Sequence, residues 1–114
     1  MGRMTAAIWL AGTMLVTAVA NASLAQDAAH IPVMLKNHRF MPAEIHVRAN
    51  VPSQILLTNT DPAAEEFDSE SLHVEKVITG GAKGVVRLRP LAPGRYPFMG
   101  EYHSGTAQGV VIAE

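Results

Sequence analysis

The chain has 114 residues, which is enough for one small domain. Nine Lys and Arg against ten Asp and Glu give a formal net charge of −1, which excludes an extended basic surface for nucleic acid or anionic lipid. The chain has no cysteine, so disulfides, a cysteine nucleophile and a thiolate metal ligand are all excluded.

Residues 1–25 have the composition of a secretory signal peptide. The basic residue Arg3 is followed by an uncharged apolar run over 6–20 and by small residues that fit cleavage near Ala25. The apolar run is shorter than the roughly 20 residues that span a bilayer. We therefore expect an exported protein whose mature domain covers 26–114, with a retained N-terminal anchor as the alternative.

The remaining chain alternates apolar and polar side chains, which is typical of half-buried strands. Seven short strands are predicted, over 31–35, 44–48, 53–58, 71–78, 84–89, 96–99 and 110–112. Turn residues separate them, and no window has the periodicity of an amphipathic helix. This pattern predicts an all-β, Greek-key sandwich of about seven strands.

Two segments between these strands are predicted as turn or loop. Residues 37–42 form a turn that carries the apolar Phe40, and residues 61–70 hold five acids and no base around Phe67. In the simplest interpretation the acidic segment is a solvated loop. In the functional interpretation Glu66, which is next to Phe67, reaches the end of the sandwich where His103 lies.

The segment from Leu91 to Tyr96 predicts a tyrosine corner. In such a corner the phenol of a tyrosine at the start of a strand bonds to the backbone just upstream. We expect this role for Tyr96, which supports the fold and carries no chemistry.

The loop between the last two strands holds the strongest candidate for chemistry, His103. Glu101 lies two residues before it, and Gly100 and Gly105 allow the backbone to bend tightly. Imidazole and carboxylate ligands together suit Cu(II), Zn(II) or Fe(II). The predicted metal ligands are His103, Glu66 and Glu101; an exposed histidine without function is the alternative.

The other histidines are weaker candidates. Alternation places His46 and His73 on strand faces in water, whereas His38 lies in a turn that a Greek-key fold can bring near the C-terminal loop. The sequence contains no G-x-S-x-G, H-E-x-x-H or P-loop motif, so an enzyme is not predicted.

Three motifs in order resemble the cupredoxin family. They are N-x-x-F-x-P-x-x-I-x-V over 37–47, T-N-T-D over 58–61 and P-G-x-Y-x-F over 93–98. By position, the copper-ligating cysteine of the blue-copper members falls on Gly100 and their later histidine on His103. The axial ligand falls near Gln108, and the earlier histidine falls within 65–67. The resemblance therefore implies a cupredoxin-like domain without a type 1 copper site.

Two longer stretches make this resemblance more specific. They are N-T-D-P-A-A-E-E-F-D-S-E-S-L and G-R-Y-P-F-M-G-E-Y-H-S-G. Both are similar to the small periplasmic cupredoxin-like proteins of bacterial ferrous-iron uptake systems. This implies a periplasmic protein that binds a copper or iron ion and acts with a membrane iron permease or another periplasmic iron-uptake component. Two alternatives remain: a sandwich that docks on a basic partner through its acidic loop, and a ferroxidase.

Overall fold

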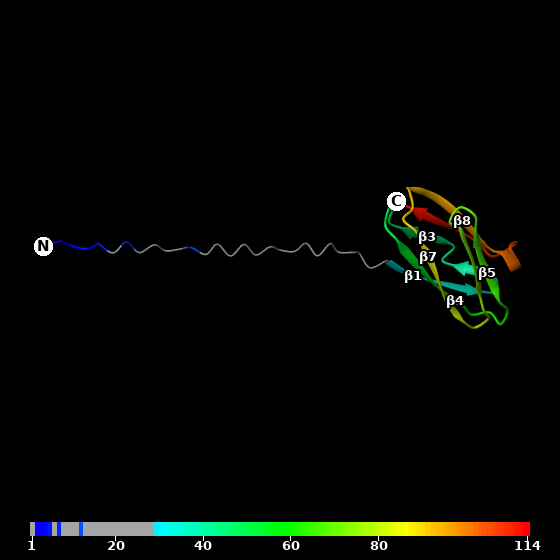
Figure 1. Ribbon diagram of the computed structural model, residues 1–114. Helices are drawn as coiled ribbons and strands as arrows, with labels where there is room; N and C mark the ends of the chain where they lie inside the picture. The colour runs from blue at the N-terminus through cyan, green and yellow to red at the C-terminus, as the bar shows by residue number, and fades with distance from the viewer. Residues whose placement is uncertain (1, 6, 8–11, 13–28) are drawn as a thin grey trace.

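A computed structural model describes residues 2–5, 7, 12 and 29–114, and the predicted all-β sandwich is confirmed (Figure 1). The signal peptide predicted over 1–25 falls largely outside the described residues and stays a prediction. The described part contains no helix long and apolar enough to cross a membrane.

Residues 29–114 form nine strands and one short 3-10 helix. They are β1 (Ala29–Lys36), β2 (Arg39–Met41), β3 (Glu44–Val47), β4 (Ser53–Asn59), β5 (Glu65–Ser69), β6 (Val74–Ile78), β7 (Lys83–Leu88), β8 (Gly94–Gly100), η1 (Glu101–His103) and β9 (Gln108–Ala113).

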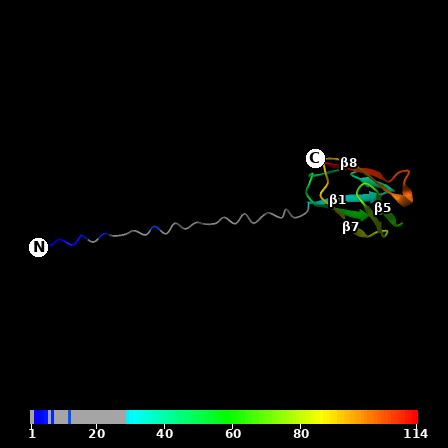
Figure 2. The same ribbon diagram turned by 45° about the horizontal axis from the view of Figure 1, so that its top comes forward.

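The strands form two mixed sheets, with the orders β2-β1-β4-β7 and β3-β9-β8-β5-β6. β1 pairs with β4 in parallel, β3 pairs with β9 in parallel, and the other pairs are antiparallel. The core between the sheets includes three phenylalanines in mutual ring contact, Phe40, Phe67 and Phe98. Figures 1 and 2 both place η1 at the end of the sandwich away from the C-terminus.

The prediction of seven strands was wrong by two. Residues 39–41 form β2, and the acidic segment that we expected to be a loop contains β5. The strand predicted over 71–78 begins only at Val74, because residues 70–73 turn and His73 has a φ of 55°. The predicted tyrosine corner is confirmed, since the hydroxyl of Tyr96 donates to the carbonyl of Ala92 at 2.8 Å.

An exposed histidine connects β3 to the end of the chain. Nδ1 of His46 lies 2.7 Å from Oε1 of Glu114, and Nε2 lies 3.0 Å from Oε1 of Glu44. The hydrogen bond with Glu114, followed by the one with Glu44, raises the pKa of His46 above 6.5 despite some desolvation. The protonated imidazole can donate to both carboxylates at once, which favours the folded state.

Replacing His46 by glutamine is expected to destabilise the domain more at pH 5.5 than at pH 8.5. The folded-state pKa is raised, so this contribution is present below the unfolded value of about 6.5 and is lost as the pH rises through the folded value. Thermal unfolding of the wild type and His46→Gln at both pH values measures the difference. An equal difference at both values would contradict the ionic character of the contact.

Candidate metal centre

Three side chains from distant parts of the chain meet at the end of the sandwich that carries η1. A ligand atom from each of His38, Glu65 and His103 lies within 4.8 Å of the other two. His38 belongs to the turn between β1 and β2, Glu65 begins β5, and His103 ends η1. No other such group of three is found among residues 29–114 and the few described residues before them.

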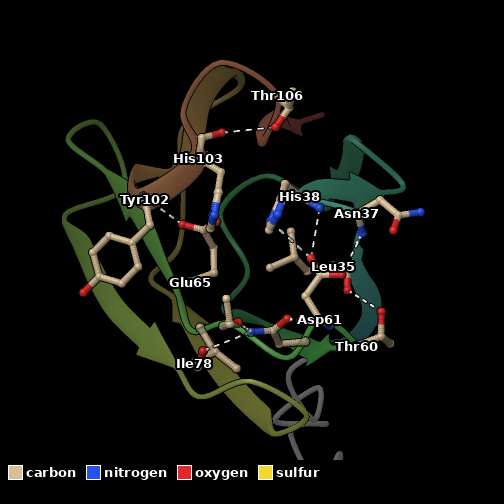
Figure 3. A network of polar contacts seen from close by, with 12 residues as sticks. Leu35, Asn37, His38, Thr60, Asp61, Glu65, Ile78, Tyr102, His103 and Thr106 are labelled. Atoms are coloured by element: carbon tan, nitrogen blue, oxygen red, sulfur yellow. Dashed lines mark hydrogen bonds and ion pairs between the residues drawn. The ribbon is translucent and has the colours of Figure 1, made fainter.

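Glu65 is the buried member of the cluster, with 1% of its surface exposed. The regular alternation of β5 turns Glu65 to the interior together with Phe67 and Ser69. Its Oε1 accepts a hydrogen bond from the backbone N–H of Glu66 at 3.0 Å. It also accepts one from the backbone N–H of Tyr102 at 2.9 Å (Figure 3). The carboxylate therefore ties β5 to η1 as well as facing the histidines.

His103 faces the second oxygen of this carboxylate. Its Nδ1 lies 2.5 Å from Oε2 of Glu65, so the two side chains are in hydrogen-bonding contact. The backbone carbonyl of His103 accepts from the N–H groups of Ala107, at 2.9 Å, and Thr106, at 3.1 Å, which closes the loop behind the ring. The imidazole is thus held in place while 29% of the side chain stays accessible to solvent.

His38 reaches the cluster because of the tight turn between β1 and β2. Asn37 and His38 have φ values of 51° and 57°, as in the two-residue turns that favour hairpins. The side chain of Asp61 caps both residues by accepting from their backbone N–H groups, at 2.8 and 2.9 Å. The bond from the N–H of His38, followed by that from Asn37, lowers the pKa of Asp61, so this cap is anionic at neutral pH.

The two imidazoles are stacked, with ring centroids 3.6 Å apart and planes inclined by 13°. The lone pair of an imidazole nitrogen lies in the ring plane, and a ligated metal sits there at about 2 Å. Two nearly parallel rings at this spacing cannot direct their lone pairs at a single ion. Joint ligation by His38 and His103 therefore requires one ring to turn out of the stack.

A type 1 copper site does not fit these residues. The chain has no cysteine, and the position that carries it in the resemblance is Gly100. A Cβ at Gly100 would lie 2.6 Å from Cδ of Glu65 and 2.8 Å from Cβ of Ala107. Glu65 thus fills the space into which a side chain at position 100 would extend. Two imidazoles and one carboxylate form a donor set that fits Cu(II) or Fe(II) instead.

The predicted ligands were only partly brought together. His103 lies in the cluster, but it is paired with Glu65 and not with Glu66. Glu66 alternates to the outer face of β5 and interacts there with Glu101. Partial burial, followed by the charges of Glu101, Glu75 and Asp68, raises the pKa of Glu66. A metal-binding role for Glu66 and Glu101 stays a prediction.

The outer face of β5 is therefore acidic. A shallow groove next to it is lined by residues 68–71, His73 and 97–99, and it does not include the three residues of the cluster. The docking of this face on a basic partner, the alternative to metal binding, stays a prediction.

Glu65 was not predicted as a metal ligand, and His38 was only a weaker candidate. The reasons for these two outcomes differ. The period-two rule places Glu65 on the face of Phe67 only once residues 65–69 are known to form a strand, and the sequence did not indicate that strand. For His38 the sequence offered only the turn, which made it a weak candidate. Its position over His103 depends on the cap from Asp61, 23 residues away.

Comparison with known proteins supports the fold and its relation to copper proteins. A family model described as a cupredoxin-like domain matches residues 5–113. An uncharacterized protein of Rickettsia prowazekii is 34% identical over 82 residues, which cover 72% of this chain and 66% of that relative. The chain thus spans slightly less than two thirds of the relative's length.

Solved structures with the same fold include copper proteins. The metal-binding domain of the Cu(I)-exporting P-type ATPase CopA of Streptococcus pneumoniae is 20% identical, with a TM-score of 0.67 and coverage of 75% of this chain and 84% of that domain. The blue copper protein auracyanin A of Chloroflexus aurantiacus is 13% identical, with a TM-score of 0.66 and coverage of 77% and 100%. At these identities the likeness shows the fold. With the family match over most of its length, the chain belongs to the cupredoxin-like domain family.

Proposed function

We propose that this protein binds a copper or iron ion through His38, Glu65 and His103, in the periplasm and as an accessory of iron uptake rather than as an enzyme. The observation that carries the proposal is the convergence of three ligand atoms within 4.8 Å. These residues come from three separate segments, and two of them are partly open to solvent, so an ion can reach the site.

The donor set selects the kind of ion. One carboxylate and two imidazoles are harder ligands than the thiolate and thioether that hold Cu(I), which favours Cu(II) or Fe(II). Because three protein ligands leave coordination positions open, the bound ion can exchange with water or with a partner's ligand. Binding, release and delivery are the chemistry that such a site supports.

The location and the iron-uptake role have support from the sequence. Residues 1–25 have the composition of a signal peptide, and the acidic and C-terminal stretches are similar to periplasmic proteins of ferrous-iron uptake. A membrane iron permease or another periplasmic component would then be the partner that receives the ion.

Isothermal titration of the metal-free protein with Cu(II), and with Fe(II) under anaerobic conditions, tests the proposal. We expect one ion per chain for the wild type and no measurable binding for His103→Ala, because the ring faces both other ligands. His30→Ala is the matched control, since His30 is exposed on β1 and is not part of the cluster. Equal binding by His103→Ala and the wild type would overturn the assignment.

A further inference from the structure

Asp61 lies directly behind His38 and makes three contacts with the turn between β1 and β2. Its Oδ1 accepts from the N–H of Asn37, and its Oδ2 accepts from the N–H of His38. The same Oδ2 lies 3.5 Å from Nδ1 of the His38 ring. These contacts are drawn in Figure 3, and only 7% of Asp61 is exposed, so its carboxylate is largely shielded from water.

Asp61 is itself anchored on the core. Its N–H donates to Oδ1 of Asn59 at 3.0 Å, and its carbonyl accepts from the N–H of Gly81 at 3.0 Å. Asn59 is fully buried and donates to the carbonyls of Ala63, at 2.9 Å, and Ile78, at 3.2 Å. The carboxylate of Asp61 is therefore a fixed point to which the turn is attached.

The ring of His38 is held much less firmly than its backbone. It is 43% exposed and is held by the stack with His103 and by the 3.5 Å contact with Asp61. This ring can turn about its side-chain torsions while the backbone stays in place. Such a movement is what joint ligation with His103 requires, because the stacked rings cannot share an ion.

From this contrast we propose that Asp61 is a positioning residue for metal binding. The carboxylate of Asp61 fixes the backbone of the turn, so that only the ring of His38 has to move when it binds the ion. The same carboxylate faces Nδ1 of this ring, which leaves Nε2 as the nitrogen that ligates the ion. Ligating histidines commonly present their second ring nitrogen to a carboxylate in this way. The inference rests on the proposed function, since it concerns how the same site is completed.

A double-mutant cycle on Cu(II) affinity tests this role. Asp61→Asn keeps the size of the side chain but replaces one acceptor oxygen by a donor group. We expect it to weaken binding about 10-fold in the wild-type background, and less than about twofold in the His38→Ala background, where no ring remains to be positioned. If Asp61 only supported the fold, the weakening would be the same in both backgrounds, and this result would overturn the proposal.

The electron paramagnetic resonance spectrum of the Cu(II) protein gives a second, independent measurement. The nitrogen hyperfine coupling should show two nitrogen ligands in the wild type and one in His38→Ala. In Asp61→Asn a larger fraction of the bound Cu(II) than in the wild type should have only one nitrogen ligand. Two nitrogens in Asp61→Asn at unchanged affinity would contradict the proposal. If Asp61→Asn does not fold, Asp61→Glu, which displaces the carboxylate by one methylene group, takes its place in both experiments.

The measurements distinguish a failure of the proposed metal binding from a failure of the role of Asp61. A wild-type protein that binds no Cu(II) or Fe(II) contradicts the proposed function. Tight binding that is equally sensitive to Asp61 with and without the His38 ring contradicts only the role of Asp61.

Discussion

Replacing Glu65 by glutamine is expected to weaken Cu(II) binding by roughly 100-fold, which corresponds to about 2.8 kcal/mol. Glutamine retains one oxygen that can accept from the N–H groups of Glu66 and Tyr102, but it replaces the oxygen that faces His103 by an amide group. The disturbed hydrogen bond between the buried side chain and His103 is also expected to lower the free energy of unfolding by about 2 kcal/mol. Titration calorimetry and urea unfolding measure the two effects.

Glu66→Gln is the matched control for this experiment. It makes the same chemical change at the adjacent position, but on the outer face of β5 beside Glu101. We expect its affinity for Cu(II) to stay close to that of the wild type. The opposite ranking, with Glu66→Gln the weaker binder, would return the ligand role to the residue that the sequence had favoured.

Replacing Gly100 by alanine is expected to lower the free energy of unfolding by about 3 kcal/mol. The added Cβ would lie 2.6 Å from Cδ of Glu65 and 2.8 Å from Cβ of Ala107, and all three positions are buried. Relieving the contact with Ala107 requires the loop before β9 to move, and relieving the contact with Glu65 pulls its carboxyl group away from Tyr102 and His103. For a domain of this size the melting temperature should fall by about 10–20 °C.

Gly105→Ala provides the comparison, because Gly105 lies close by, in the turn between η1 and β9, and a Cβ there meets nothing within 4 Å. Its melting temperature should change by only a few degrees. If both variants were equally destabilised, the cause would be the loss of a glycine in this part of the chain and not the space that Glu65 occupies.

The fold could be predicted from the sequence wherever apolar and polar residues alternate. Val33 and Leu35, or Val86 and Leu88, are inward residues of the strands expected there, and the structure buries them. β5 could not be predicted in the same way because its inward residues are Glu65, Phe67 and Ser69. Two polar residues on the buried face erase the hydrophobic alternation, and they are buried only because the hydrogen bonds to η1 and β8 satisfy them.

Only part of the metal centre could be predicted, and the reason is related to the one that applies to β5. His103 could be found from its loop and from the family resemblance, both of which are local in sequence. Glu65 and His38 take their positions from long-range contacts, namely the burial of β5 beside β8 and the cap that Asp61 places on the turn. Such contacts leave no periodic signal, so the sequence indicated the right end of the sandwich but named only one of the three converging residues, His103, as a metal ligand.

The pairing of β9 has a consequence for the order in which this domain folds. β9 lies between β3 and β8 in its sheet, and residues 44–47 pair in parallel with 110–113. During synthesis β3 therefore has no partner in this sheet until residues 110–113 have emerged, and closing such a long loop is slow. The five-stranded sheet can be completed only after β9 has been synthesised, and until then the backbone N–H and C=O groups of β3 lack their partners in this sheet.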